Sequence, residues 1–540
     1  MREKAKQLAH DFLINEKEYR LGFVEAEQRN PLTTTLGDDF RESTHKGLDT
    51  LIRADEALCS VFNAVLDSRN FSDLVEKLYS CINNGGRVII SGCGSSGRLA
   101  MRIEASWRIA VKALGKYENS VRSLMTGGDY ALIRAVESFE DYICLGQMQA
   151  RELDLTNKDI LIGVTATGET TSVLGTAMQA LDDGASVCMV VCTDPASLLG
   201  KLKRADAVYT HPNCESIYIP CGAMAVTGST RMQSTTIEQA VIASALEIAL
   251  SKLCGEEMNA SYLQNGFRSC IDTLKLDSVK ESMAELADTE TKLYENHGHV
   301  TYYADEYLLD ILADTTERGP TFCVPPFRPK SRMNDAMSWA FAKNPFCNTK
   351  DAWYACFERE PRCIDKTAEE YAALGIKSED ISRIPKINAD ALYEFEIGCE
   401  RDAERESDES LAVWIGEAVP DEFIGFAKNY KASAHLVLDT SVLVKTKLKI
   451  FDHITLKLMI NNVSTGTMAK MSRIYGNYMV CLNISNKKLI DRAARIISQL
   501  CGIDYDAATE ELFYSRLLLE ESGEAQSPVK FTIDRLKSKL

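Results

Sequence analysis

Small and hydroxyl-bearing residues are concentrated in one turn of the chain, between an apolar run and a helical pattern. The strand-like segment 87–92 leads into Gly94, Ser95 and Ser96, and Leu99 begins the helix-like stretch. Glycines let the backbone pass close to a ligand, and serine hydroxyls donate hydrogen bonds to anionic oxygens. Because a helix N-terminus also favours negative charge, this turn predicts a seat for a phosphate group.

The same turn is compatible with other interpretations. Gly92, Gly94 and Gly97 satisfy the dinucleotide pattern G-x-G-x-x-G, and Glu118 stands about where an acidic ribose partner is expected, roughly 20 residues on. A Walker loop is excluded more firmly, because no Gly-Lys-Ser/Thr follows. A helix start capped by serine, with no ligand, is the third possibility.

A second hydroxyl-rich turn favours a small phosphorylated ligand over a dinucleotide. The apolar segment 159–164 leads into Thr165, Ala166 and Thr167, and a helical pattern follows from Val173. Two such turns at the carboxyl ends of parallel strands can enclose one small ligand at a topological switch point. A dinucleotide would not need the second turn.

The elements that must position these turns alternate between strand and helix. Strands are expected around 87–92, 120–125, 159–164 and 186–192, which predicts a parallel, doubly wound sheet in an α/β fold. A second alternating region begins at 299–304. Its first turn, 305–307, carries two acids and no glycine or serine, so we expect it to repel a phosphate.

The length of 540 residues predicts two or three domains. We expect a helical N-terminal segment over 1–60, a ligand-binding domain over 61–270, a second domain with a degenerate site over 271–473, and a helical C-terminal segment over 474–540.

Composition bounds the class of protein. A hydrophobic content of 45% with 26% charged residues is typical of a globular protein, and the net charge of −17 disfavours nucleic acid and anionic membrane surfaces as partners. Without a basic leader or an apolar stretch near 18 residues, the expected location is the cytoplasm. The 17 cysteines form no C-x-x-C pair and the seven histidines are scattered, so neither a metal nor another cofactor is expected.

Ordered motifs occur along the chain at 27–31, 94–99, 165–170, 227–232, 463–466 and 486–489. Together they resemble the sugar isomerase (SIS) superfamily. More narrowly, they look like the branch that contains N-acetylmuramic acid 6-phosphate etherase and the glucokinase regulatory protein. The resemblance implies two flavodoxin-like, doubly wound SIS domains in one chain, with the second domain replacing the partner subunit of a one-domain ancestor.

The resemblance also implies roles for single residues. Glu140 matches the second catalytic glutamate of the etherases, but the position of the first holds Ser106. Glu104 lies two residues away, roughly 200° around a helix, and cannot simply replace it. Glu317 and Lys488 match a sugar-contacting glutamate and a ligand-contacting lysine of the regulatory type. The serine argues against unmodified etherase chemistry.

We therefore expect a protein that binds a phosphorylated sugar, either a hexose phosphate or an N-acetylhexosamine or muramic acid 6-phosphate, in a sensing or regulatory role. The alternative is an etherase-like lyase or a sugar-phosphate isomerase that uses Glu140. Any protein partner is unknown, and glucokinase is not predicted because Leu438, Asp439 and Thr440 stand where the resemblance would require aromatic anchors. The expected sugar-phosphate contacts are Gly94, Ser95, Ser96, Glu140, Thr165, Ala166, Thr167, Glu317 and Lys488.

Overall fold

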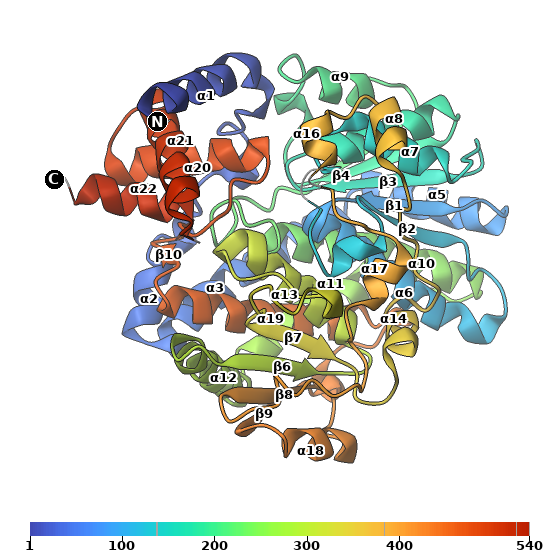
Figure 1. The fold of residues 1–540 in the computed structure, drawn as a ribbon. Coiled ribbons are helices and arrows are strands. Elements are labelled where there is room, and N and C mark those ends of the chain that lie inside the picture. Colours follow the sequence, from blue (N-terminus) through green and yellow to red (C-terminus); the bar gives the residue numbers. More distant parts are fainter. Residues whose placement is uncertain (137–138, 383, 525, 539–540) are drawn as a thin grey trace.

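Two separate parallel sheets organise the computed structural model, which describes residues 1–136, 139–382, 384–524 and 526–538 (Figure 1). The first sheet has the order β2-β1-β3-β4-β5. Chain order reverses between β1 and β3, so the topological switch point lies where these two strands end. Its strands are β1 (Val88–Gly92), β2 (Val121–Met125), β3 (Ile160–Thr165), β4 (Ser186–Val191) and β5 (Cys214–Tyr218).

Helices cover both faces of this sheet. Ile89 and Ile90 are neighbours in β1, and because successive side chains point to opposite faces, they belong to different hydrophobic clusters. Ile90 shares its cluster with residues of α5 (Arg69–Asn83), α6 (Gly94–Val111) and α10 (Gln233–Leu253). Ile89 shares the other with residues of α7 (Ile143–Arg151), α8 (Thr171–Asp182) and α9 (Lys203–Tyr209). The sheet is therefore doubly wound.

The second sheet repeats most of this arrangement. Its order, β7-β6-β8-β9, is that of β2-β1-β3-β4 in the first sheet, and all its pairs are parallel. The strands are β6 (His299–Tyr303), β7 (Ala340–Lys343), β8 (Ser410–Gly416) and β9 (Ala432–Val437). The helices of this region are α12 (Asp277–Glu295), α13 (Leu308–Phe322), α14 (Thr349–Phe357), α15 (Ala368–Ala373), α16 (Ser378–Ile381), α17 (Ala389–Tyr393) and α18 (Asp421–Ala427).

One long helix, α19 (Ile450–Lys470), lies between the two halves. It packs against α10 of the first half and against α12 and α13 of the second, as well as α11 (Ala260–Leu274). Almost all residues of α19 are buried. A helix buried on all sides has no polar face, which explains why apolar and small polar side chains occur all round this one.

Helices from the two ends of the chain pack together (Figure 1). Phe12 of α1 (Arg2–Asn15) meets Phe513 of α21 (Tyr505–Ser522) with ring centroids 6.4 Å apart. Other terminal elements are α2 (Leu36–Glu42), α3 (Thr44–Glu56), α4 (Leu58–Leu66), the hairpin of β10 (Ile474–Tyr475) and β11 (Tyr478–Met479), α20 (Lys487–Cys501) and α22 (Pro528–Lys537).

The fold class predicted from the sequence is confirmed, with two differences in detail. β5 was not expected, because 214–218 mixes polar and apolar residues at an edge of the sheet. The helix after β1 begins at Gly94 rather than Leu99, so Ser95 and Ser96 belong to its first turn. The two sheets lie within 61–270 and 271–473, while the boundaries themselves stay predictions.

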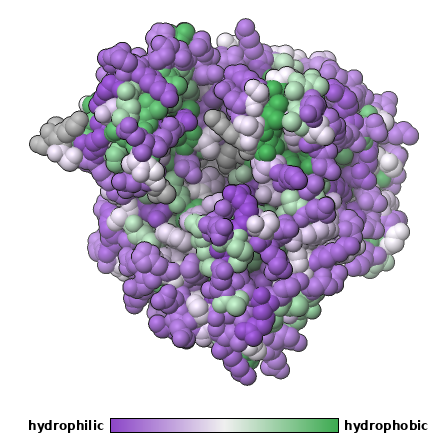
Figure 2. Space-filling model, viewed as in Figure 1, coloured by the Kyte–Doolittle hydropathy of each residue, from purple (hydrophilic) through white to green (hydrophobic). Residues whose placement is uncertain are grey.

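The outer surface in one view is mainly hydrophilic, with scattered hydrophobic patches (Figure 2). Among the described residues, no helix combines the length and apolar character needed to cross a bilayer.

Candidate functional site

The turn after β1 is shaped by two glycines. At Gly92, a Cβ atom would lie 2.5 Å from the backbone carbon of Ser96, so a side chain there would displace the turn. Gly94 has a φ of 54°, a left-handed conformation that glycine adopts most easily. The backbone N–H of Ser96 donates to the carbonyl of Cys93 at 3.1 Å. These contacts hold Ser95 and Ser96 at the N-terminus of α6.

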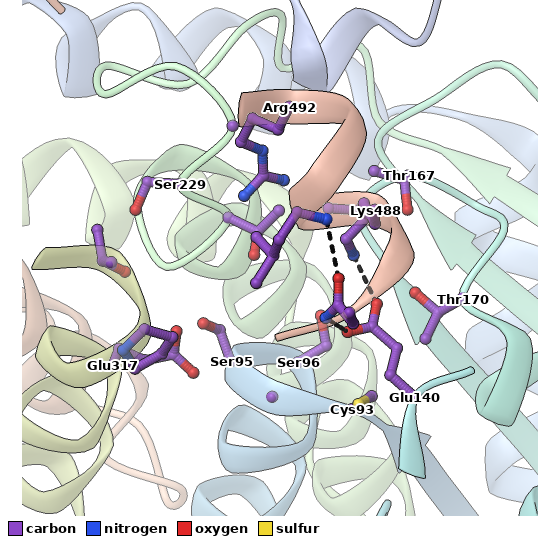
Figure 3. A pocket seen from close by; sticks show the side chains of 18 of the residues that line it. Cys93, Ser95, Ser96, Glu140, Thr167, Thr170, Ser229, Glu317, Lys488 and Arg492 are labelled. Carbon is purple, nitrogen blue, oxygen red and sulfur yellow. Dashed lines mark hydrogen bonds and ion pairs between the residues drawn. The ribbon is translucent and has the colours of Figure 1, made fainter. Parts of the chain in front are cut away.

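A pocket that is partly open to solvent lies above this turn (Figure 3). Within the described parts of the chain, the buried hydroxyl oxygens of Ser95 and Ser229 have no hydrogen-bond partner. Buried hydroxyls are normally hydrogen-bonded, so two orphaned ones in a pocket indicate a polar ligand. The lining residues are Cys93, Gly94, Ser95, Ser96, Glu140, Thr165, Ala166, Thr167, Thr170, Gly228, Ser229, Thr230, Glu317, Pro320, Thr321, Met479, Asn486, Lys488, Leu489 and Arg492.

The second predicted turn lines the same pocket and is held by its own hydroxyls. Thr165 and Thr170 are joined by a hydrogen bond of 2.8 Å between their Oγ1 atoms. Thr167 donates to Glu169 at 3.0 Å, and Glu169 is paired with Arg204 at 2.7 Å. The pocket therefore contains both turns, as expected for the edge of a sheet next to its switch point.

Glu140 meets Lys488 at one side of the pocket (Figure 3). Nζ of Lys488 donates to Oε1 of Glu140 at 2.6 Å, and Nδ2 of Asn486 donates to Oε2 at 3.2 Å. Burial lowers the pKa of Lys488, but the carboxylates of Glu140 and Glu169 outweigh it and the pKa lies above its usual value. Lys488 thus stays positive and can bind an anion.

Glu317 brings a second carboxylate into the pocket from α13, in the other half of the molecule. It is paired with Arg98 of α6, whose guanidinium also donates to the carbonyl of Ala131 at 2.6 Å. Arg98 is almost fully buried, so this pair ties the first half to the second beside the phosphate turn. Glu140 and Glu317 are therefore available to one ligand.

Neither residue that the sequence raised in place of the missing glutamate lines the pocket. Ser106 is buried on α6 away from it. Glu104 accepts hydrogen bonds from Arg359 and Arg362, which belong to the second half. Burial raises the pKa of Glu104, but the two guanidinium groups outweigh it and hold the pKa at about 2. Glu137, beside Glu140 in the sequence motif, lies outside the described residues.

Sequence reasoning missed several pocket residues that only the fold brings together. Arg492 lies one helical turn beyond Lys488 on α20, and its guanidinium is paired with buried Glu27 from the N-terminal segment. The spacing of four between two basic residues was a usable clue, because such residues share a helix face. Ser229 lies in the quoted 227–232 motif, and Asn486 in the 486–489 motif, but neither had been assigned a contact.

The dinucleotide interpretation does not fit the sheet. Glu118 precedes β2, so it lies at the amino edge, and it pairs with Arg108 at 2.8 Å. The acid of a dinucleotide site belongs at the carboxyl edge. Within the described ranges, no group of three or more His, Cys, Asp or Glu side chains could hold a metal ion.

The corresponding turn of the second sheet is closed by its own polar contacts. Asp305 accepts a hydrogen bond from Asn344 at 3.0 Å. Glu306 is paired with Lys449 at 2.7 Å, and Tyr307 donates to Glu417 at 3.1 Å. The two acids of this turn, Asp305 and Glu306, thus have hydrogen-bond or ion-pair partners within the chain.

Comparison with known proteins gives three related findings. Residues 70–181 match the family model of the glucokinase regulatory protein N-terminal SIS domain. The chain is 32% identical over 216 residues to N-acetylmuramic acid 6-phosphate etherase 2 of Vibrio parahaemolyticus, covering 40% of this chain and 66% of that protein. It is 30% identical over 277 residues to N-acetylmuramic acid 6-phosphate etherase of Yersinia pestis. This match covers 50% of this chain and 88% of that protein.

Among solved structures, tagatose-6-phosphate ketose/aldose isomerase of Escherichia coli matches with a TM-score of 0.43 and 11% identity. That match covers 81% of this chain and 94% of the isomerase.

Proposed function

Because the chain belongs to the SIS superfamily branch of N-acetylmuramic acid 6-phosphate etherase and the glucokinase regulatory protein, we propose that it binds an amino-sugar 6-phosphate and acts as an etherase-type lyase. The observation that carries this proposal is the presence of two carboxylates, Glu140 and Glu317, in one pocket with the serine turn. The substrate class is that of the etherase relatives, N-acetylmuramic acid 6-phosphate.

The two ends of such a substrate need different groups. The phosphate is an acceptor of hydrogen bonds, which suits Ser95, Ser96 and the N-terminus of α6. Lys488 adds a positive charge that its neighbours keep protonated. The sugar hydroxyls need acceptors, which the carboxylates supply.

The chemistry requires a pair of proton-transfer groups. One carboxylate removes the proton at C2 of the sugar, and a second group delivers a proton to the ether oxygen on C3, so that the C–O bond breaks and lactate leaves. We assign Glu140 to this work, with Glu317 as the second carboxylate in place of the residue replaced by Ser106. The sequence favoured a sensor because Ser106 stands at the position of the first catalytic glutamate. Glu317, which the sequence indicated only as a sugar contact, lines the same pocket as Glu140 and can serve as the second carboxylate.

Lactate release from N-acetylmuramic acid 6-phosphate tests the proposal. We expect turnover on the order of 1 per second or faster in the wild-type chain, with a loss of at least 100-fold in Glu140→Gln and in Glu317→Gln. Glu295→Gln, at an exposed position near the end of α12, is the matched control and should keep the wild-type rate. No lactate from the wild-type chain would contradict the lyase assignment.

A sensing role is the second candidate, and the ion pair of Glu140 with Lys488 favours it, because a carboxylate held by a lysine is not free to approach a substrate proton. A sensor would bind sugar phosphates without releasing lactate. Thermal-shift measurements with N-acetylglucosamine 6-phosphate separate the cases: binding without turnover supports the sensor, and neither binding nor turnover contradicts both.

A further inference from the structure

A fully buried carboxyl group lies directly behind the phosphate turn. Glu238 is on α10, and its Oε2 atom lies 3.3 Å from Oγ of Ser96, which lines the pocket. Its other oxygen lies 3.6 Å from Sγ of Cys192, the residue directly after β4. Glu238 does not line the pocket, so it can act on a ligand only through Ser96.

This carboxyl has no ion-pair partner among the described residues. The charge of Lys457 on α19 acts on Glu238, but its ammonium donates instead to the carbonyl of Arg231, to Thr236 and to Asn461. Burial raises the pKa of Glu238 to about 8, although the contacts with Cys192 and Ser96 and the charge of Lys457 act against it. Near neutral pH, Glu238 therefore carries a proton.

The state of Glu238 decides what Ser96 offers to the pocket. A serine hydroxyl has one proton to donate. When Glu238 is ionised, Ser96 must donate to it and presents only lone pairs to the pocket, where they repel a phosphate. When Glu238 is protonated, its O–H donates to Oγ of Ser96, and the serine proton is free for the ligand.

We propose that Glu238 is a positioning residue that holds a proton so that Ser96 donates to the ligand phosphate, making sugar-phosphate binding dependent on that proton. The inference rests on the proposed phosphate site. Binding takes up a proton when Glu238 begins ionised, so affinity is highest below the pKa of Glu238 and falls as pH rises above it.

The pH dependence caused by Glu238 must be distinguished from that of other titratable groups near it. Burial lowers the pKa of Lys457 to about 7, and Asp55 of α3, which faces it, has a pKa raised by burial to about 7. Burial raises the pKa of Cys192 well above the ordinary thiol value, and Cys221 is its neighbour. Lys457 and Asp55 titrate close to the pH range in which Glu238 ionises, but both are kept in a Glu238 variant, so the difference between that variant and wild type isolates the effect of Glu238.

Calorimetry with N-acetylglucosamine 6-phosphate at pH 7 and pH 9 tests this inference. The phosphate is a dianion across this range. We expect wild-type affinity to fall about tenfold from pH 7 to pH 9, with close to one proton taken up per ligand at pH 9. In Glu238→Gln the amide always donates to Ser96, so this variant should bind about tenfold more tightly than wild type at pH 9 and take up no proton through this residue.

Glu238→Leu can neither donate to Ser96 nor accept its proton, so it should show no pH dependence through this residue. Because the Ser96 hydroxyl is then no longer oriented, this variant should bind more weakly than Glu238→Gln at both pH values. Combined with Ser96→Ala, the Gln and Leu variants should bind equally, because the contact acts only through Ser96. Parallel pH profiles in wild type and Glu238→Gln would overturn the inference and leave the phosphate site intact. No binding by wild type at either pH would instead contradict the proposed function, and the inference with it.

Discussion

The carboxyl edges of the two sheets have the same topology and different chemistry. After β1, a glycine turn places two serines at a helix start, and the hydroxyls of Ser95 and of nearby Ser229 have no partner among the described residues. After β6, the equivalent turn holds Asp305 and Glu306, each satisfied by a neighbour. The first edge has polar groups available for a ligand, whereas the acids of the second edge are hydrogen-bonded or ion-paired within the chain.

The difference teaches how one chain can build a site from two similar halves. The second half contributes Glu317 and α13 to the pocket of the first half and no phosphate turn of its own. Lys449 closes its turn by pairing with Glu306, whereas Lys488 lies in the open pocket with Glu140. That the second domain replaces the partner subunit of a one-domain ancestor stays a prediction.

The largest expected effect on ligand affinity is that of replacing Lys488, compared with replacing Lys449. Lys488→Ala removes the pocket cation and leaves Glu140 to repel a phosphate, so we expect the affinity for N-acetylglucosamine 6-phosphate to fall by about 2–5 kcal/mol. Lys449→Ala, at the second edge, is the matched control and should leave the affinity unchanged. Calorimetry of both variants checks this, and a loss of binding in the Lys449 variant would reverse the roles of the two edges.

The ion pairs of Glu104 with Arg359 and Arg362 join the two halves, and we expect them to stabilise the fold in a pH-dependent way. Its pKa is held at about 2 by Arg359 and Arg362, against an ordinary value of about 4.5. The folded-state pKa is depressed, so the stabilisation is complete above about pH 5 and is lost as the pH falls toward 2. The contribution of Glu104 to the free energy of unfolding at neutral pH is about 3 kcal/mol.

Glu104→Gln is the variant that tests this contact. It should lower the thermal midpoint at pH 7, and the difference from wild type should shrink on acidification. A difference that does not change between pH 6 and pH 3 would rule out this pair as a source of acid sensitivity.

A smaller effect is expected at the serine turn. Ser96→Ala removes one donor to a charged oxygen and should weaken sugar-phosphate binding by roughly 1.5–3 kcal/mol. Because alanine also removes the hydroxyl that contacts buried Glu238, the thermal midpoint without ligand should fall as well, which makes the affinity measurement the deciding one. Unchanged affinity in calorimetry would remove Ser96 from the site.

The smallest effect belongs to the second turn. Asp305→Asn keeps the shape of the side chain that faces Asn344, and we expect the affinity to change by less than about 0.5 kcal/mol. The stoichiometry should stay at one ligand per chain. A marked loss of affinity, or a second ligand bound by the wild-type chain, would show that this edge also takes part in binding.

Local patterns were enough to predict the parts of the fold in which sequence and structure agree. Apolar runs ending in glycine or hydroxyl turns identified β1 and β3 and the residues beside them, because the strand period and the turn chemistry are both local. β5 escaped notice because an edge strand carries a mixed pattern. The start of α6 was placed late because Ser95 and Ser96 were treated as a loop.

Contacts between distant segments could not be predicted from local pattern. Glu104 and Glu140 are both acids of the first half, and only the fold shows their different surroundings. Glu104 is paired with two arginines from the second half, and Glu140 with Lys488. Glu238 looks like any polar residue of a long helix until its burial behind Ser96 is seen. The resemblance supplied Glu317 and Lys488, which residue types alone would have left as surface charges.

A crystal structure of the chain with N-acetylglucosamine 6-phosphate tests the central claim most directly. We predict one ligand, with its phosphate at the Ser95 and Ser96 turn and within reach of Lys488, and with its sugar hydroxyls facing Glu140 and Glu317. A phosphate at the Asp305 turn, or a ligand bound away from both Ser96 and Lys488, would contradict the account.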